Sequence, residues 1–490
     1  MKKYDLLKVL GITFAIIVLI SWVIPAGIYS DGSFTSLEMT NPIGLFDLVN
    51  IPLLIFNNFI EFGLLLLAIG GLYGVLNTTG VYSKLVETVT NKWKKNSKKF
   101  LIITTVIFSL LSSVIGLNSV IFILMPFFAT ILLKLGFNKV PTLAATVGGL
   151  LIGQIGSTLG SDMWGYTNVI FGSISTEMSM FTLILVRLVL LVVVTALYCL
   201  IISKSVKEVK TEVKEETKKT KKASKEKQAE IKEEVKVDIP LYEKKESKKD
   251  IFPLVIIFVI MFAILIVGTY KWVYTFNIDV FTTIHEQITE FEINGYPLLT
   301  NILGNISSLG EWNNYNIIFV LIAASLIIAW LYSVKFSEAF DGFVKGVKQM
   351  LVPAFYAVLS CIIFTAVLSL SANFVYTLVN QFTSGEEFSL MGTIASSAVT
   401  SFTYSVFPQP INAFAGFFSE LDAGAISVVA LIFQTIYGLV MLIAPTSVFL
   451  LAGLSYLEVP YKDWMKFIWK FALAVLGIII VVAFIATIFV

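Results

Sequence analysis

The chain has 490 residues, of which 57% are apolar and 14% are charged, and its formal net charge is +2. Soluble proteins carry about 25% charged residues, so a soluble fold of this length could not cover its surface. The charges are also concentrated, because 28 of the 68 lie between Lys204 and Asp250. This composition excludes a cytosolic enzyme, a secreted domain and a nucleic-acid-binding protein, and it predicts an all-α polytopic membrane protein.

Apolar runs follow one another along the chain, and each is close to the roughly 20 residues that a membrane-spanning helix needs. They cover residues 9–26, 51–76, 180–202, 251–268, 317–331, 351–370 and 467–490. Lysine-rich connections alternate with lysine-poor ones, and lysine marks the cytoplasmic side. We therefore expect a multi-pass protein of the bacterial cytoplasmic membrane, with its N-terminus inside and its C-terminus outside.

In each of two further apolar regions, the sequences before and after the region have the same charge character. Residues 101–133 have basic flanks and a polar centre at Gly116–Ser119, whereas residues 390–418 have lysine-free flanks and a polar centre at Tyr404–Pro410. A segment whose two flanks belong on one side of the membrane returns to that side. Each region is therefore predicted to be a re-entrant hairpin or a tight helical pair, one from each side.

A crossing with an interrupted middle follows each hairpin. Residues 140–172 are interrupted at Gly156–Asp162, and residues 425–457 are interrupted at Ala444–Ser447. The matching order predicts two inverted repeats, the architecture of many secondary transporters. The predicted parts are a first repeat at 1–203, a charged cytoplasmic linker at 204–250, a joining transmembrane helix at 251–268, an external loop at 269–316 and a second repeat at 317–490. The linker is interpreted as a solvated tether, either disordered or a charge-laced helix.

The polar residues at the four interruptions are candidates for a substrate or ion site. Unpaired backbone groups are costly in hydrocarbon, so broken helices persist around a protein-lined or wet cavity. The N-terminus of a half-helix favours a carboxylate, and freed carbonyls favour a cation. The candidates are Asn118, Ser119, Ser157, Thr158, Ser161, Asp162, Gln409, Asn412, Thr446 and Ser447.

Other interpretations of these residues stay open. The glycines and prolines could be ordinary kinks, and serine and threonine could bond back to a helix carbonyl. Asp162 is either a buried coupling acid or a residue at the outer surface. Arg187, the single arginine, either supplies counter-charge to a carboxylate in the cavity or extends toward the interface. Glu61 is a further acid within an apolar run.

The cysteine and histidine content bears on cofactors. The chain has two cysteines, and its one histidine, His285, lies outside the apolar runs. Histidine-based zinc and haem sites and a disulfide framework are therefore not expected. We expect no cofactor, with Na⁺ or H⁺ as the coupling ion.

Several motifs occur in the order known from one carrier family. Trp22–Gly27 resembles the W-I-I-P-A-G signature of the YfcC-like carriers, which belong with the C4-dicarboxylate anaerobic carriers in the ion transporter superfamily. Gly70–Gly80 is similar to the family's glycine-rich stretch, and Ser337–Phe340 to its S-E-A-F element. Gln434 with Pro445-Thr446-Ser447, followed by Pro460–Phe467, resembles the pattern Q…P-T-S…P-Y-x-x-W-x-K-F.

The resemblance implies a cytoplasmic-membrane carrier for amino acids or dicarboxylates that is coupled to a cation or exchanges substrates. Related carriers usually have an acidic pair at the first hairpin tip, where this chain has Gly116–Val120 without a carboxylate. Their second tip is typically S-G-S-G-Q, where this chain has Ser405–Gln409. Basic amino acids are the substrate class that the family resemblance implies by default. The acidic pair that would recognise a cationic side chain is absent from this first hairpin tip.

The sequence is therefore interpreted as a secondary active transporter of a small carboxylate-bearing metabolite, working by alternating access. An ion channel and an intramembrane enzyme are the alternatives. No H-E-x-x-H motif, no helically spaced aspartate pair in the apolar runs and no filter-like repeat occurs in the sequence, which favours the carrier over both. The expected partners are an organic substrate and the lipid bilayer, with a homodimer considered and no nucleic acid.

Overall fold

The computed structural model describes residues 5–30, 33–174, 180–221, 239–304, 307–383 and 388–489. Within these ranges nine helical segments are long and apolar enough to cross a membrane. They are Asp5–Val23, Leu45–Thr79, Val81–Val114, Leu183–Val206, Phe252–Thr269, Asn314–Leu331, Phe336–Leu368, Ala423–Tyr456 and Tyr461–Ile488. The prediction of a mainly helical, polytopic membrane protein is confirmed.

The N-terminal half forms a series of helices and one short sheet. Its α-helices are α1 (Asp5–Val23), α2 (Leu45–Thr79), α3 (Val81–Trp93), α4 (Ser97–Val114), α5 (Asn118–Phe122), α6 (Met125–Lys134), α7 (Lys139–Leu143), α8 (Gly149–Ile155), α9 (Tyr166–Ile174) and α10 (Met180–Lys221). Tighter or wider helical turns are η1 (Lys94–Asn96), η2 (Ala144–Gly148) and η3 (Ser161–Gly165). The strands β1 (Gly27–Ser30) and β2 (Ser33–Ser36) pair antiparallel, with Gly27 opposite Ser36.

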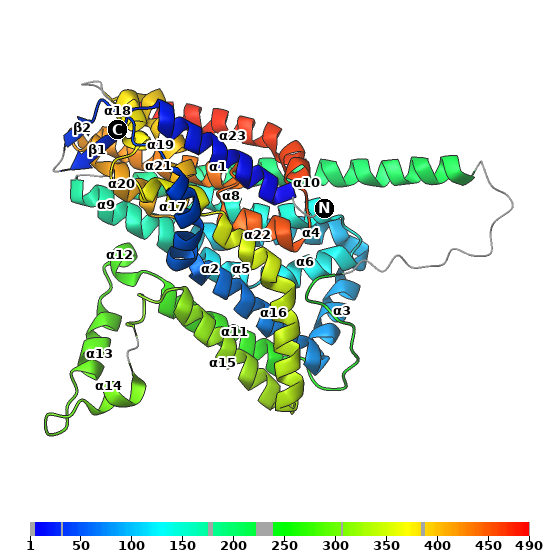
Figure 1. Cartoon of the computed structure of the whole chain (residues 1–490). Helices are drawn as coiled ribbons and strands as arrows, with labels where there is room; N and C mark the ends of the chain where they lie inside the picture. Colours follow the sequence, from blue (N-terminus) through cyan, green and yellow to red (C-terminus); the bar gives the residue numbers. More distant parts are fainter. Residues whose placement is uncertain are drawn as a thin grey trace.

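In the described residues of the C-terminal half, the named elements are all helices. Its elements are α11 (Phe252–Thr269), α12 (Trp272–Phe276), α13 (Val280–Thr289), α14 (Leu298–Leu303), α15 (Asn314–Leu331), α16 (Phe336–Leu359), α17 (Ile362–Leu368), α18 (Phe374–Thr383), α19 (Leu390–Thr403), α20 (Gln409–Phe414), η4 (Ala415–Phe418), α21 (Ala423–Ile443), α22 (Val448–Tyr456) and α23 (Tyr461–Phe489). Helices α13 and α14 project away from the bundle, and α10 extends beyond it (Figure 1).

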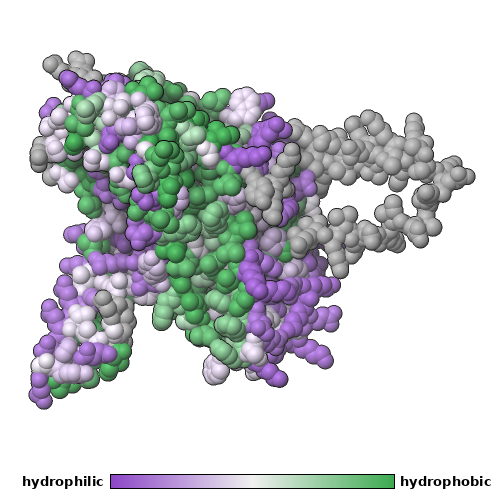
Figure 2. Space-filling model, in the orientation of Figure 1, coloured by the Kyte–Doolittle hydropathy of each residue, from purple (hydrophilic) through white to green (hydrophobic). Residues whose placement is uncertain are grey.

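The bundle has two polar ends with an apolar band between them (Figure 2). One end carries lysines on several elements, among them Lys94, Lys134 and Lys345, and we call it the lysine-rich end. Helix α11 begins near this end and reaches the opposite end at Thr269, where α12 follows. Helix α1 begins and α23 ends at opposite ends of the bundle (Figure 1). The molecule therefore has the layout of a membrane protein with polar faces on two sides.

Among the interruptions of helical structure in the described part of the bundle, four fall where the sequence predicts them. Break 1 is residues 115–117, break 2 is 156–160, break 3 is 404–408 and break 4 is 444–447. Glycine or proline occurs in every break: Gly116, with a positive φ of 74°, lies in break 1, Gly156 and Gly160 lie in break 2, and Pro408 and Pro445 lie in breaks 3 and 4. These breaks coincide with the interruptions expected from the sequence. Re-entrant insertion of the hairpins and the inverted relation of the two halves stay predictions.

Helices α2 and α16 join the two halves by backbone contact. A Cβ atom at Gly346 would lie 2.7 Å from the carbonyl carbon of Gly70, and one at Gly74 would lie 2.9 Å from that of Gly342. Small residues allow such close approach between helices in a membrane. The pair therefore forms a rigid framework beside which the broken helices are arranged.

Helix α21 lies at the centre of the bundle. Of the most apolar stretch of residues 423–456, 94% is buried inside the protein, against 22% for α1. A Cβ at Gly438 would lie 2.5 Å from the backbone nitrogen of Ile155, so α21 crosses α8 at the last residue before break 2. This crossing brings the second half of the chain against an interruption in the first.

Candidate functional site: a cavity between four helix breaks

One cavity of about 260 Å³ is lined by residues that lie in or just after each of the four breaks. From each break it takes residues in the break itself or in the first turn of the following helix. These are Leu117–Val120, Asp162 and Met163, Ser405–Pro408, and Ser447–Phe449. Further polar lining comes from Glu61 of α2, Gln154 of α8, Tyr437 of α21, and Lys271, Asn313 and Asn314 near the end opposite the lysine-rich one.

The first two breaks dock against each other. The Thr158 amide donates to the Ser113 carbonyl (3.0 Å), and the Ser113 hydroxyl donates to the Gly156 carbonyl (2.7 Å). A Cβ at Gly116 would lie 2.6 Å from the Gly160 carbonyl carbon, so this contact needs glycine. Backbone groups released by both interruptions therefore satisfy each other without water or lipid.

Helix α21 holds breaks 2 and 3 from the other side. The Gln434 amide nitrogen donates to the Ser157 carbonyl (2.7 Å), and the Tyr437 hydroxyl donates to the Ser405 carbonyl (2.9 Å). Both side chains are buried and lie one helical turn apart. A single helix thus fixes the relative position of interruptions that belong to the two halves of the chain.

Break 4 is completed by two aromatic donors from α23. The Trp464 indole donates to the Leu442 carbonyl (3.0 Å), and the Tyr461 hydroxyl donates to the Ile443 carbonyl. The last carbonyls of α21 would otherwise lack partners, since the helix ends inside the protein. This gives a physical reason for the P-Y-x-x-W pattern at Pro460–Trp464.

Several buried oxygens beside the breaks have no hydrogen-bond partner among the described residues. They are Oε1 of Gln154, Oγ of Ser157, Oγ of Ser405, Oε1 of Gln434 and Oγ1 of Thr446. Buried polar atoms in proteins nearly always have a partner, so each of these oxygens is able to accept a further polar contact. Of the five residues, Gln154 and Ser405 line the cavity.

The charged side chains of the cavity lining are Glu61, Asp162 and Lys271. The Lys271 amide donates to the Ser161 hydroxyl (2.6 Å), which holds this lysine beside the start of η3. Burial lowers the pKa of Lys271, although the nearby carboxylates of Asp162 and Glu311 oppose that shift. Among the described lining residues Lys271 is the single side chain that carries positive charge.

The structure brings only some of the expected residues to the cavity. Asn118, Ser119, Asp162 and Ser447 line it. Six others do not line it: Ser157, Thr158, Ser161 and Thr446 are buried, whereas Gln409 and Asn412 are exposed. The Asn118 side-chain oxygen accepts a hydrogen bond from Ser112 (3.0 Å), which orients the amide.

Arg187 is fully buried but lies outside the cavity lining. Its guanidinium carbon is 4.8 Å from the ring centre of Trp164, which follows the lining residue Met163. None of its three side-chain nitrogens has a hydrogen-bond partner among the described residues. A buried cation in this state is costly unless a counter-charge reaches it.

Sequence reasoning missed several residues that the geometry places at the site. Gln154, Ser405, Tyr437 and Lys271 line the cavity, and Gln434 supports it. A signal existed for Lys271, which is the one lysine between residues 251 and 334. Gln154 and Gln434 are amides within otherwise apolar helices, where an uncompensated polar group is costly.

These features define a multi-pass membrane protein with a polar cavity between interrupted helices, which is the layout of a transporter. The sequence model of the family described as C4-dicarboxylate anaerobic carriers (DcuC) matches residues 5–489. The chain therefore belongs to the C4-dicarboxylate anaerobic carrier family, as its motifs indicated. Comparison with curated proteins gives no match, and comparison with solved structures gives none either.

Proposed function

We propose that the protein is a secondary active transporter that carries a small carboxylate-bearing metabolite by alternating access. C4-dicarboxylates are the first candidates and amino acids the second. The observation that carries the proposal is one cavity whose lining includes residues in or just after each of the four helix breaks. A volume of about 260 Å³ suits a metabolite of a few carbon atoms, and family membership supports a dicarboxylate.

The chemistry of the lining favours a carboxylate. Helix α22 begins at Val448, so the amides of its first turn lie at the cavity with the positive end of the helix. Ser447 and Asn118 add a hydroxyl and an amide, and Lys271 adds a full positive charge. Half-helix N-termini hold substrate carboxylates in other carriers with broken helices.

The charges of the lining favour entry of a cation together with the substrate. Glu61 and Asp162 outnumber Lys271, so the lining is net negative before a substrate binds. A dicarboxylate adds two further negative charges in a region of low dielectric, where like charges repel strongly. Bound Na⁺, or protons taken up with the substrate, would offset this repulsion. Coupling to Na⁺ or H⁺ is therefore our proposal, with exchange as the alternative.

Arg187 is proposed as counter-charge for a substrate carboxylate. Its guanidinium has no hydrogen-bond partner among the described residues, and it lies against the ring of Trp164, which follows the lining residue Met163. Movement of the segment that contains break 2 would bring the substrate and this guanidinium together. We also propose that the lysine-rich end faces the cytoplasm, with the N-terminus inside and the C-terminus outside.

The test is counterflow in proteoliposomes with a panel of C4-dicarboxylates and amino acids, with and without Na⁺ and pH gradients. Asn118→Ala and Arg187→Met should each lower dicarboxylate uptake by tenfold or more, since a lost hydrogen bond to a charged group costs roughly 1.5–3 kcal/mol. Asn412→Ala is the matched control, because Asn412 is exposed and does not line the cavity.

Folded yield separates function from stability. Removal of a buried unpaired charge should leave the thermal stability of Arg187→Met unchanged or raised. Normal uptake by both test variants, or uptake of no carboxylate in the panel by the unmodified protein, would contradict the proposal.

A further inference from the structure

A short segment at the lysine-rich end connects parts of the molecule that are distant in sequence. Residues 239–250, which we call the strap, precede α11 and belong to the charged region expected to be a solvated tether. The strap is packed against the bundle instead, and Leu241 is only 1% exposed. Helix α10 carries the start of the charged region to Lys221, and residues 222–238 lie outside the described part of the chain.

Side chains of the framework helices α2 and α16 form hydrogen bonds with the backbone of the strap. The Asn77 side chain of α2 donates to the Leu241 carbonyl (3.1 Å) and accepts from the Glu243 amide (3.1 Å). The Leu241 amide donates to the Gln349 side chain of α16 (2.7 Å). These bonds need a fixed backbone path, so the strap is a specific part of the fold.

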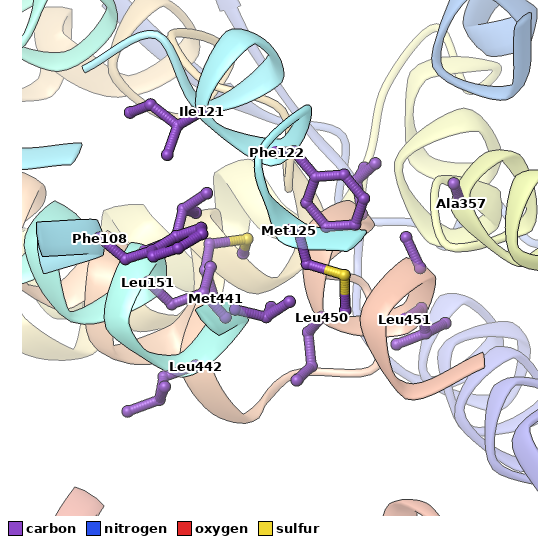
Figure 3. Packing of buried hydrophobic residues seen from close by; sticks show 14 of the residues in the cluster. Phe108, Ile121, Phe122, Met125, Leu151, Ala357, Met441, Leu442, Leu450 and Leu451 are labelled. Atoms are coloured by element: carbon purple, nitrogen blue, oxygen red, sulfur yellow. The ribbon is translucent and has the colours of Figure 1, made fainter. Parts of the chain in front are cut away.

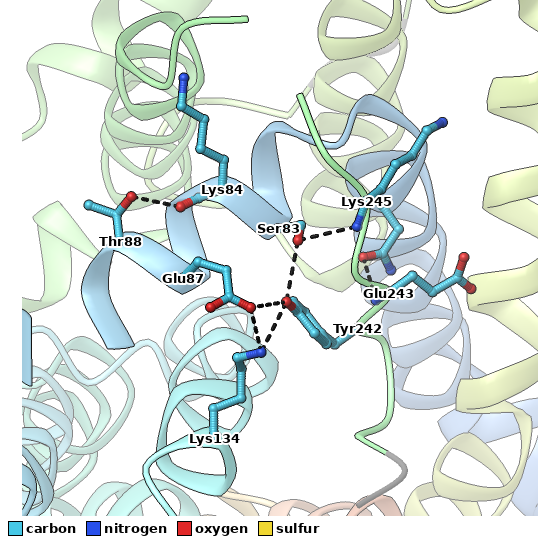
Figure 4. Close-up of polar contacts among 9 residues, drawn as sticks. Ser83, Lys84, Glu87, Thr88, Lys134, Tyr242, Glu243 and Lys245 are labelled. Atoms are coloured by element: carbon cyan, nitrogen blue, oxygen red, sulfur yellow. Dashed lines mark hydrogen bonds and ion pairs between the residues drawn. The ribbon is translucent and has the colours of Figure 1, made fainter. Parts of the chain in front are cut away.

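Tyr242 connects the strap to the end of α6 (Figure 4). The Lys134 ammonium donates to Glu87 of α3 (2.7 Å) and to the Tyr242 hydroxyl (3.2 Å), and the same hydroxyl donates to Glu87 (3.1 Å). The ammonium also lies 4.5 Å from the centre of the Tyr242 ring. Hydrogen bonds that involve charged groups are about twice as strong as neutral ones.

A second connection reaches the end of α22. The Tyr456 hydroxyl donates to the carbonyl of Pro240 in the strap (3.0 Å). Lys134 is the last residue of α6 and Tyr456 is the last residue of α22. The segment α5–α6 and helix α22 both begin at the cavity and both end at the strap.

An apolar layer separates the cavity from the strap. The layer consists of Phe122 and Met125 of the segment α5–α6 and of Leu450 and Leu451 of α22. None of these side chains is more than 1% exposed. Figure 3 shows these side chains together with Leu442 in the buried cluster. Lys271 and Asn314, by contrast, line the cavity near the opposite end of the bundle. The cavity is therefore closed toward the lysine-rich end.

We propose that the strap is a cytoplasmic latch. It binds the ends of α6 and α22 to the framework of α2, α3 and α16, and so holds the apolar layer closed below the cavity. The inward-facing state then requires Tyr242 to leave Lys134 and Pro240 to leave Tyr456. The latch rests on the proposed alternating access and adds the element that controls its cytoplasmic side.

The test measures access to the cavity from each side of the membrane. The reporter is Val406→Cys, a lining position, in a background in which Cys199 and Cys361 are replaced by alanine. Labelling with a membrane-impermeant maleimide is compared between right-side-out and inside-out vesicles. Tyr242→Ala should raise cytoplasmic labelling about tenfold, the population change expected from losing charged hydrogen bonds, and lower labelling from outside.

The control is Thr88→Ala, one residue after Glu87. The Thr88 hydroxyl donates only to the Lys84 carbonyl of its own helix, so this variant should label as the parent does. Tyr242→Phe keeps the ring and loses the hydroxyl, and it serves as a milder variant if Tyr242→Ala gives little folded protein. Unchanged labelling in both folded Tyr242 variants would overturn the latch. A reporter that labels from neither side in any background would instead contradict the cavity, and with it the proposed function.

A cross-link distinguishes a latch, which opens during transport, from a permanent tie, a strap contact that stays closed throughout. In the variant Tyr242→Cys/Lys134→Cys without the reporter, a short bifunctional maleimide should abolish transport relative to the same variant before cross-linking. A tie that stays closed through the whole cycle would leave the transport rate of this variant unchanged by cross-linking, and that result would refute the latch.

Discussion

At the scale of single residues, Lys271 is the most informative member of the site. It lies just beyond the end of α11 and lines the cavity opposite two acids. If it holds a substrate carboxylate, its charge is needed for binding and its replacement by arginine should preserve part of that binding. Lys271 lies outside the apolar runs of the sequence, so charged residues within those runs do not include it.

We predict that Lys271→Gln raises the KM for a dicarboxylate about tenfold or more, as expected for the loss of a partly buried charge interaction. Because burial lowers the pKa of Lys271, its charged form is lost as pH rises through that lowered value. Uptake by the unmodified protein should therefore fall at a lower alkaline pH than uptake by Lys271→Arg. The measurement is initial uptake against substrate concentration and external pH.

Lys95→Gln serves as the control for a general charge effect, since Lys95 is exposed at the other end of the bundle and lies outside the strap and the cavity lining. Identical kinetics of Lys271→Gln and Lys95→Gln would show that Lys271 does not meet the substrate.

The sequence predicts where the broken helices end, but only in part which of their side chains face the cavity. Gly116 and Pro445 mark where a helix must stop, because their backbone constraints are local. Which side chain then faces the cavity depends on packing against other helices. Asn118 and Ser447 face it, whereas Gln409, equally close to its break, is exposed. Local chemistry thus located the breaks but not the direction of each side chain.

At the scale of helices, the contact between α2 and α16 depends on four glycines. Gly70 and Gly74 face Gly342 and Gly346 so closely that backbone meets backbone. Such packing gains van der Waals contact where no hydrophobic effect operates between helices. The strap attaches to these same two helices through Asn77 and Gln349.

We predict that Gly346→Ala destabilises the protein by about 1–3 kcal/mol, the usual cost of overpacking. The added methyl would lie 2.7 Å from the Gly70 carbonyl carbon, and both helices would have to separate. Gly477→Ala in α23 is the control, since nothing lies within 4 Å of its added Cβ. Thermal unfolding in detergent should show a lower Tm for Gly346→Ala and an unchanged or higher Tm for Gly477→Ala. Equal Tm values would show that the close contact is dispensable.

At the scale of the whole molecule, composition predicted the class of protein better than the roles of its parts. Apolar spans follow from hydropathy because the lipid requires them. The charged region between Lys204 and Asp250 was interpreted as a tether because its average composition is that of a solvated chain. Leu241 and Tyr242 are nevertheless anchored in the bundle by partners such as Asn77 and Glu87, far away in sequence. Average composition cannot show such contacts.

The orientation of the two halves gives the last prediction. Helices α3 and α4 meet at η1 on the lysine-rich side, whereas Ser389 precedes α19 in the lysine-free flank of the second hairpin region. If the halves are inverted, a cysteine at Asn96 should react with an impermeant maleimide only from the cytoplasm, and one at Ser389 only from outside. Both residues are exposed, so each should react wherever the reagent can reach it. Labelling of both positions from one side would exclude the inverted arrangement, because hairpins entering from the same face cannot be related by an axis in the membrane plane.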